Sequence, residues 1–104
     1  MFAMSGHPVA QAAPPAPSDV DAGRGLFEGK GQCLSCHRVQ DTGGSTARDL
    51  SWIGLLRTPD KLRAAVVNPT RHPNASAFSS DEIDRLVAYL RTRRTLWALS
   101  TGLS

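Results

Sequence analysis

The sequence predicts an all-α fold in a single domain, and three observations lead to that prediction. No segment of any length shows the alternation of apolar and polar residues that is typical of a strand. Apolar residues recur instead at spacings of three and four, and helix-capping patterns precede two of these segments. A length of 104 residues fits one domain, and the sequence contains no internal repeat.

The first helix is expected from Ser18 or Asp19, either of which can cap it, to about Lys30. Its apolar side has helical spacing and comprises Val20, Gly23 and Phe27. Glycines at positions 29 and 31 then end the helix.

A loop over residues 41–46 and a short apolar stretch over residues 49–56 follow. Thr58 and Pro59 predict the start of the next helix, since a capping hydroxyl precedes proline at the first helical position. Leu62, Ala65 and Val66 share one side of this helix. It must end near Asn68, because the residue before a proline disfavours helical geometry.

After a second loop over residues 70–78, Ser79 and Glu82 form the pattern of a capping box. The helix that they begin is expected to run to about Arg93, and arginines at its end suit the negative end of the helix dipole. Its apolar stripe comprises Ile83, Leu86, Val87 and Leu90.

The domain is expected to span residues 18–94, between two segments of a different kind. Residues 1–17 are rich in Ala and Pro and are interpreted as a disordered arm or the remnant of an export signal. Residues 95–104 form a tail whose Trp97 packs on the core, binds a partner or frays. No apolar run approaches the length of a membrane span.

The composition favours a soluble domain that is completed by a cofactor. Only 6% of the residues are aromatic, which is little for the core of so small a domain. The formal charge of +3 suggests weak steering toward acidic partners and is no signal for nucleic acid. Two cysteines are too few for a disulfide scaffold.

The run Cys33-Leu34-Ser35-Cys36-His37 is the signature of covalent haem attachment. Cysteines three positions apart on a helical turn can bond both haem vinyl groups, and His37 is then placed over the iron as an axial ligand. A zinc site would need two more ligands, and the sequence has no further cysteine. A thioredoxin-like redox pair would require a βαβ pattern that is not visible here.

From about Asp19 to Arg94 the chain resembles a class I c-type cytochrome domain. Members begin with a helix that carries Gly and an aromatic residue, as Gly23 and Phe27 do here, and end with a Leu-x-x-Tyr pair, as in Leu86 and Tyr89. The resemblance implies three to four helices wrapped around one covalently bound haem c. It also implies that the first and last helices cross closely at the glycine.

The run from Arg48 to Gly54, followed by Leu62 and by the pair Asn68-Pro69, resembles haem domains associated with periplasmic dehydrogenases. The resemblance assigns Arg48, Leu50 and Trp52 to the haem pocket, and it implies that the Arg48 carbonyl accepts a hydrogen bond from His37. Ala47-Arg48 stands where the family usually has Gly-Pro, so the rigidity of that proline is lost. The Arg48 side chain either pairs with a haem propionate or is solvated.

The second axial ligand departs from the family's pattern. Most members place Met-Pro in the loop before the last helix, whereas this chain has His72-Pro73 there. We therefore expect the iron to be bound by His37 and His72, which should lower the reduction potential relative to methionine ligation. Asn74, water, His7 and Met4 are the alternatives to His72.

These features predict a monohaem electron carrier rather than an enzyme. Its partners would be redox proteins such as a dehydrogenase, a cytochrome or a terminal oxidase, either as a free carrier or as a subunit of a larger redox enzyme. A haem-based binder or sensor of small ligands, with an open sixth position, is the alternative. Because haem is attached outside the cytoplasm, the resemblance implies a periplasmic protein or an exported, membrane-facing one.

Overall fold

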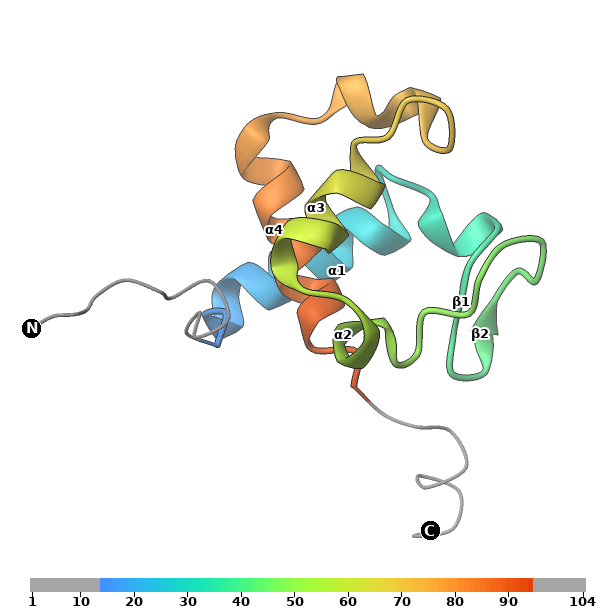
Figure 1. Ribbon diagram of the computed structural model, residues 1–104, viewed down its shortest axis with the longest axis horizontal. Coiled ribbons are helices and arrows are strands. Elements are labelled where there is room, and N and C mark those ends of the chain that lie inside the picture. The colour runs from blue at the N-terminus through green and yellow to red at the C-terminus, as the bar shows by residue number, and fades with distance from the viewer. Residues whose placement is uncertain (1–13, 95–104) are drawn as a thin grey trace, which may run out of the picture.

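A computed structural model describes residues 14–94 (Figure 1). The predictions for most of the N-terminal arm and for the tail with Trp97 lie outside the described residues. The described chain contains the helices α1 (Pro17–Glu28), α2 (Ile53–Leu56), α3 (Pro59–Val66) and α4 (Ser80–Arg91), with two short 3-10 helices, η2 (Cys33–Ser35) and η3 (Pro73–Ala77). Two antiparallel strands of two residues each, β1 (Arg38–Val39) and β2 (Thr42–Gly43), form a minimal hairpin. The expected all-α fold is confirmed.

The crossing of α1 and α4 is the central packing contact of the fold (Figure 1). A Cβ atom on Gly23 would collide with the carbonyl oxygen of Arg85 on α4, so only glycine allows the two backbones to approach this closely. One turn later the rings of Phe27 and Tyr89 pack with centroids 5.2 Å apart and planes at 51°. The glycine-mediated crossing that the resemblance implied is therefore present.

Two of the predicted helix starts are confirmed in detail. The Thr58 hydroxyl accepts a hydrogen bond from the backbone N–H of Lys61 at 3.3 Å, and Pro59 begins α3. At α4 the Ser79 hydroxyl accepts from the N–H of Glu82 at 3.1 Å, while the Glu82 carboxylate accepts from the N–H of Ser79 at 2.9 Å. Each side chain thus satisfies a backbone donor that the helix leaves unpaired.

The predicted start of the first helix is wrong. Neither Ser18 nor Asp19 caps α1, because the helix begins at Pro17 with Ala16 at the cap position and no capping side chain. Proline fits the first helical position without a partner, since it has no N–H to satisfy. The helix then ends at Glu28, two residues before the expected Lys30. The last helix ends at Arg91, also two residues before its expected end.

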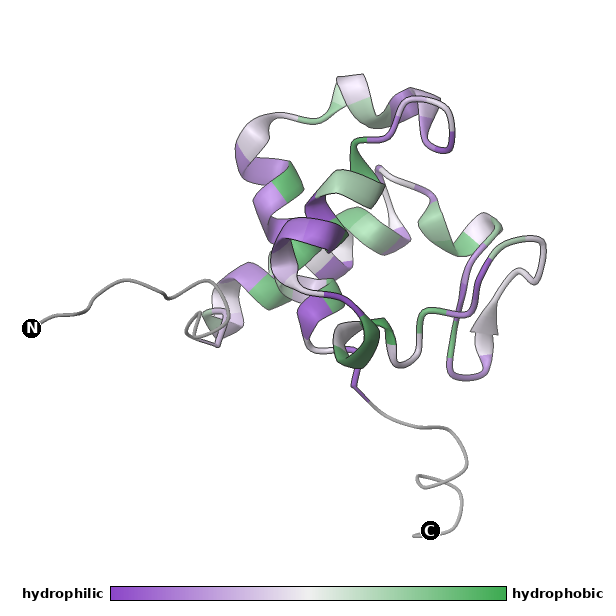
Figure 2. Ribbon diagram, in the orientation of Figure 1, coloured by the Kyte–Doolittle hydropathy of each residue, from purple (hydrophilic) through white to green (hydrophobic). Residues whose placement is uncertain are grey.

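The apolar core lies between α1, α3 and α4, with the segment before α2 closing one end. Its buried apolar residues are Phe27, Leu50, Ile53, Leu62, Ile83, Leu86, Val87, Tyr89 and Leu90. The short helix α2 is hydrophobic along its length (Figure 2), and it buries Ile53 but leaves Leu55 and Leu56 exposed. Its Gly54 N–H donates to the carbonyl of Arg93 at 2.7 Å, which ties α2 to the end of α4.

Candidate functional site

A single helical turn organises the Cys-x-x-Cys-His segment. Gln32 precedes it in the left-handed region, with φ of 50°, and turns the chain into η2. The carbonyl of Cys33 then accepts hydrogen bonds from the N–H of Cys36 at 3.3 Å and of His37 at 2.9 Å. Because residues three and four apart lie on the same side of such a turn, both thiols and the imidazole are brought together.

The β1–β2 hairpin and the segment after it hold this turn in place. Gly43 has φ of 116°, and a Cβ atom there would collide with the carbonyl oxygen of His37. The N–H of Gly44 donates to the Leu34 carbonyl at 2.8 Å, and that of Ala47 donates to the Cys36 carbonyl at 3.1 Å. The residues expected as a plain loop thus form a backbone brace for the motif.

The two cysteines are free thiols in unlike surroundings. Cys33 is half-buried, and this burial raises the pKa of its thiol. Cys36 is exposed, and hydrogen bonds from Thr46 and then Ser35 lower the pKa of its thiol. Neither sulfur atom is used in a disulfide, so both are available for covalent attachment of another group.

The ring of His37 is oriented by the backbone of residue 48. Its Nδ1 lies 2.7 Å from the carbonyl oxygen of Arg48, as the resemblance implied. A carbonyl oxygen only accepts hydrogen bonds, so Nδ1 carries the hydrogen. In the neutral ring Nε2 then bears the lone pair that a metal ligand needs.

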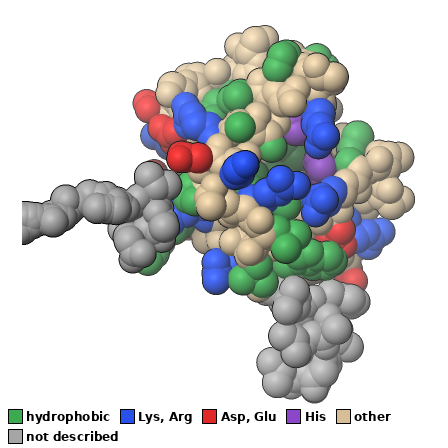
Figure 3. Space-filling model, in the orientation of Figure 1, with side chains coloured by type: hydrophobic (Ala, Val, Ile, Leu, Met, Phe, Trp, Pro, Cys, Tyr) green, Lys and Arg blue, Asp and Glu red, His purple; other side chains and the backbone are tan. Residues whose placement is uncertain are grey.

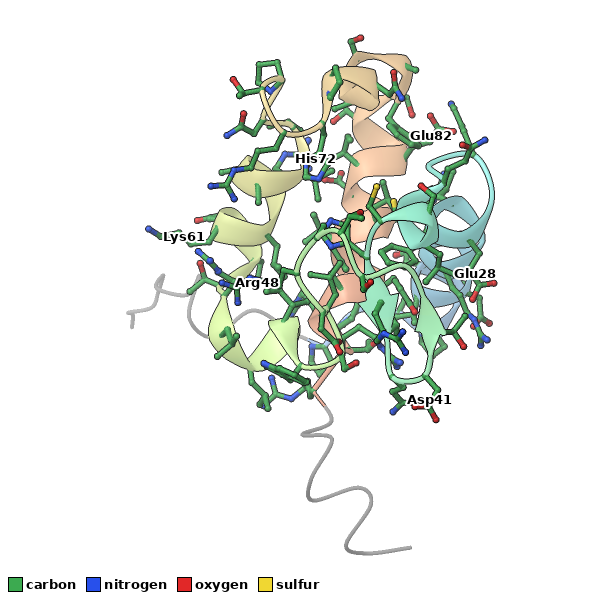
Figure 4. All side chains as sticks on the ribbon, turned by 90° about the vertical axis from the view of Figure 1, so that its right-hand side faces the viewer. Glu28, Asp41, Arg48, Lys61, His72 and Glu82 are labelled. Atoms are coloured by element: carbon green, nitrogen blue, oxygen red, sulfur yellow. The ribbon has the colours of Figure 1, made fainter. Side chains whose placement is uncertain are left out.

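The ring of His72 is held by the same kind of contact as that of His37. Its Nδ1 lies 2.8 Å from the carbonyl oxygen of Ala65 in α3, which likewise leaves Nε2 as the free nitrogen. The centroids of the His37 and His72 rings are 6.2 Å apart, with planes at 40°. Figure 3 shows two histidines close together on one face of the molecule, and Figure 4 shows His72 within the same region as the cysteine sulfur atoms.

This separation fits one metal ion held between two imidazoles. A metal–nitrogen distance of about 2 Å on each side, with each centroid roughly 1 Å behind its nitrogen, places the centroids about 6 Å apart. The observed 6.2 Å agrees with that value. The donor set also fits haem iron, for which histidine is a common axial ligand, and two thiols for covalent attachment lie beside it.

The other predicted site residues differ in their burial and in their contact with the two histidines. The backbone of Arg48 belongs to the site through His37, whereas its side chain is exposed. Leu50 is buried in the apolar core, and Trp52 is half-buried at the start of α2. Asn74 is exposed in η3. Among residues 14–94 no cluster of three or more His, Cys, Asp or Glu side chains could bind a metal ion by itself.

The structure adds two groups that the sequence did not single out, the carbonyl of Ala65 and the side chain of Asn68. From the sequence, Ala65 was named only for its apolar side chain. Asn68 was named as the end of a helix and, with Pro69, as part of the resemblance to haem domains, without a role for its side chain. Backbone acceptors leave no mark in a sequence. The Asn68-Pro69 pair, just upstream of His72, belongs to that resemblance and is also a sequence signal for a turn.

Comparisons with known proteins agree with this geometry. The family model for cytochrome c matches residues 20–94. Comparison with curated proteins and with solved structures found no match. No described helix combines the length and apolar character needed to cross a bilayer. The matched family binds covalently attached haem c, and Cys33, Cys36 and His37 fit its CxxCH motif. The chain therefore belongs to the cytochrome c family, whose domains carry electrons on haem.

Proposed function

We propose that this chain carries single electrons on one haem c whose iron is bound by His37 and His72. The separation of the two imidazole rings, 6.2 Å between centroids, is the observation that supports this proposal most directly. Haem iron bound at this site would supply the chemistry, since it alternates between ferric and ferrous states. Cys33 and Cys36 would hold the haem covalently.

The surroundings of the two histidines favour electron transfer over binding of exogenous ligands. Each ring is fixed by a hydrogen bond from Nδ1 to a backbone carbonyl, at 2.7 Å for His37 and 2.8 Å for His72. Ligands that are held in place on both sides change position little when the charge of the iron changes. A small rearrangement of this kind speeds electron exchange. Ligation by His72 would in addition occupy the sixth position and so exclude small molecules from it.

The same hydrogen bonds bear on the reduction potential. Donation of the Nδ1 hydrogen to a carbonyl makes Nε2 a stronger donor, and stronger donors favour ferric iron. Two such imidazoles should give a lower potential than the histidine and methionine pair found in most of the family.

Substitution of His72 tests the proposal. His72→Ala should open the sixth position, so that the ferrous protein becomes high-spin and binds carbon monoxide. Asn74→Ala is the matched control, because Asn74 lies two residues away and its side chain makes no hydrogen bond within residues 14–94. The measurement is the ferrous absorption spectrum before and after addition of carbon monoxide.

We expect the unsubstituted chain and Asn74→Ala to stay low-spin and to bind carbon monoxide poorly. An unchanged spectrum for His72→Ala would show that His72 is not a ligand. A high-spin ferrous spectrum in the unsubstituted chain would favour a small-ligand binder or sensor instead. If Asn74→Ala became high-spin and bound carbon monoxide while His72→Ala did not, the sixth ligand would be Asn74.

We further propose that the protein works in the periplasm, with a dehydrogenase, a cytochrome or a terminal oxidase as its partner. Covalent haem attachment in this family takes place outside the cytoplasm, which supports this location. Cell fractionation, followed by haem staining of denatured protein, tests it. Haem-stained protein in the periplasmic fraction is expected, and haem-stained protein confined to the cytoplasm would contradict the proposal.

A further inference from the structure

We infer that Asn68 is a positioning residue for His72: it builds a turn at the carboxyl end of α3 that aims His72 Nε2 at the iron. The inference rests on the proposed ligation by His72. It adds the structural element that orients this ligand. The hydrogen bonds that Asn68 accepts come from backbone N–H groups of residues 70–72, so it acts on His72 through the backbone of the turn.

The turn begins where α3 stops. The N–H of Val67 donates to the Arg63 carbonyl at 3.1 Å, and the N–H of Asn68 donates to the Ala65 carbonyl at 3.3 Å. Pro69 has no N–H and prevents a further helical turn. The chain must therefore leave the helix axis at Asn68.

Asn68 then holds the departing chain with both of its oxygen atoms. Its side-chain Oδ1 accepts from the N–H of Thr70 at 2.9 Å and from the N–H of Arg71 at 3.4 Å. Its backbone carbonyl accepts from the N–H of His72 at 2.7 Å. These bonds reverse the chain within four residues and return His72 to the end of the helix that it has just left.

The returning imidazole reaches a carbonyl suited to receive it. Ala65 lies in the last turn of α3, at the negative end of the helix dipole. Its carbonyl oxygen lacks the usual helical partner four residues on, because Pro69 has no N–H, and it accepts from the N–H of Asn68 at 3.3 Å instead. His72 Nδ1 donates to that oxygen at 2.8 Å. The contact fixes the ring plane and also increases the donor strength of Nε2.

The turn is thus matched to histidine rather than to methionine. A thioether has no hydrogen to donate, so a methionine at position 72 would leave the Ala65 oxygen without this partner. Among residues 67–78 the side chains of Asn68 and His72 are the ones that form hydrogen bonds, and both are half-buried. Together they account for the side-chain hydrogen bonding that shapes this loop.

Two substitutions at Asn68 test the inference on the haem-loaded protein. Asn68→Ala removes the Oδ1 acceptor, while Asn68→Asp keeps an acceptor at the same place. Asn74→Ala controls for loss of an asparagine from the same loop. The measurements are the rate of carbon monoxide binding to the ferrous protein, the midpoint potential and the thermal midpoint of unfolding.

We expect Asn68→Ala to raise the rate of carbon monoxide binding roughly tenfold, the lower end of the effect seen when a partner of a metal ligand is removed. The midpoint potential should rise, and by about 59 mV if the preference of His72 for ferric iron falls tenfold. Asn68→Asp should restore both values to near those of the unsubstituted chain, and Asn74→Ala should change neither.

Unchanged carbon monoxide binding and potential in Asn68→Ala would overturn the inference, as would an effect that Asn68→Asp fails to reverse. A lower thermal midpoint with unaltered potential and carbon monoxide binding would show a merely structural role, which also overturns it. Failure of the proposed ligation looks different, because His72→Ala would then leave the ferrous spectrum unchanged. The two results are therefore distinguishable.

Discussion

The two candidate iron ligands are held by the same kind of contact, a hydrogen bond from Nδ1 to a backbone carbonyl. For His37 this contact was expected, because the resemblance to haem domains placed the carbonyl of residue 48 beside it. The structure shows why Arg48 can stand where proline is usual: the carbonyl is present whatever the side chain. The partner of His72 was not expected, since the Ala65 carbonyl becomes a neighbour only once the Asn68 turn has formed.

Replacement of His72 by methionine should raise the midpoint potential. Thioether ligation favours ferrous iron, and the hydrogen bond to the Ala65 carbonyl is lost at the same time. We expect a rise on the order of a tenth of a volt, well within the span of about 0.8 V that axial ligands cover. Spectroelectrochemical titration of His72→Met gives the value, and an equal or lower potential would contradict the expected ligation.

At the scale of elements, local signals were reliable where a side chain forms the contact. Thr58, Ser79 and Glu82 cap their helices as the sequence predicted, because each cap is made within four residues of the chain. The start of α1 was missed because its first residue, Pro17, needs no capping side chain. The brace of the β1–β2 hairpin was also missed, since strands of two residues are too short to show alternation.

The crossing of α1 and α4 should be very sensitive to a single methyl group. Gly23→Ala would press a Cβ atom into the backbone of Arg85 and force the two helices apart. We expect a loss of about 1–3 kcal/mol or more in the free energy of unfolding, as for overpacked cores. Urea denaturation of the haem-loaded protein measures this quantity.

Gly25→Ala provides the matched control on the same helix. An added Cβ atom at Gly25 meets nothing within 4 Å, so the change should stabilise α1 by about 0.5–1 kcal/mol. Equal effects of the two substitutions would show that the close crossing does not govern stability.

The Lys30–Glu82 ion pair connects the end of α1 to the beginning of α4, with N–O distances of 2.8 and 3.0 Å. The hydrogen bond from Lys30, followed by that from the Ser79 backbone, lowers the pKa of Glu82. A carboxylate whose folded pKa is lowered contributes stability above its unfolded pKa. That contribution is lost as the pH falls through the folded value.

Acidification should therefore lower the free energy of unfolding of the unsubstituted chain more than that of a Glu82→Gln variant. We expect the difference in urea midpoint between the two to shrink as the pH falls from about 6 to about 3, below the unfolded glutamate pKa of about 4.3. Lys30→Gln should weaken the same pH dependence, because the hydrogen bond from Lys30 is the main cause of the lowered Glu82 pKa. A difference that stays constant over this pH range would contradict the role given to Glu82.

At the scale of the whole molecule, charge is unevenly distributed around the site. Figure 3 shows Lys and Arg side chains gathered beside the two histidines, and Figure 4 places Arg48 and Lys61 on the opposite side of the view from Glu28 and Glu82. Arg48 and Lys61 form no ion pair within residues 14–94. An anionic partner should therefore approach from the side of α3.

Oxidation of the ferrous protein by ferricyanide, an anion, should slow as ionic strength rises. Screening acts over about 10 Å at 0.1 M salt, so the unpaired cations lose their effect. Lys61→Gln should lower the rate at low salt more than Arg24→Gln does, because Arg24 lies on α1 and is already paired with Glu28. Stopped-flow absorbance measures both rates, and equal effects of the two variants would exclude a directed approach.

The sequence alone predicted the presence of α1, α3 and α4, the covalent motif and the family, because these depend on short patterns within one segment. It indicated α2 only as a short apolar stretch. It proposed the pair of His37 and His72 only from the place where a methionine is usual. Their approach to 6.2 Å depends on the crossing of α1 with α4, the hairpin brace and the Asn68 turn acting together. No pattern within a single segment encodes a distance across the fold.

The most direct test of the proposed ligation is to identify the nitrogen atoms that coordinate the iron. The chain has three histidines, so a His7→Gln variant retains only His37 and His72. This variant is grown with 15N-labelled histidine and examined in the ferric state by electron–nuclear double resonance. We expect couplings from two coordinated histidine nitrogens. Coupling from a single histidine nitrogen would contradict ligation by both residues.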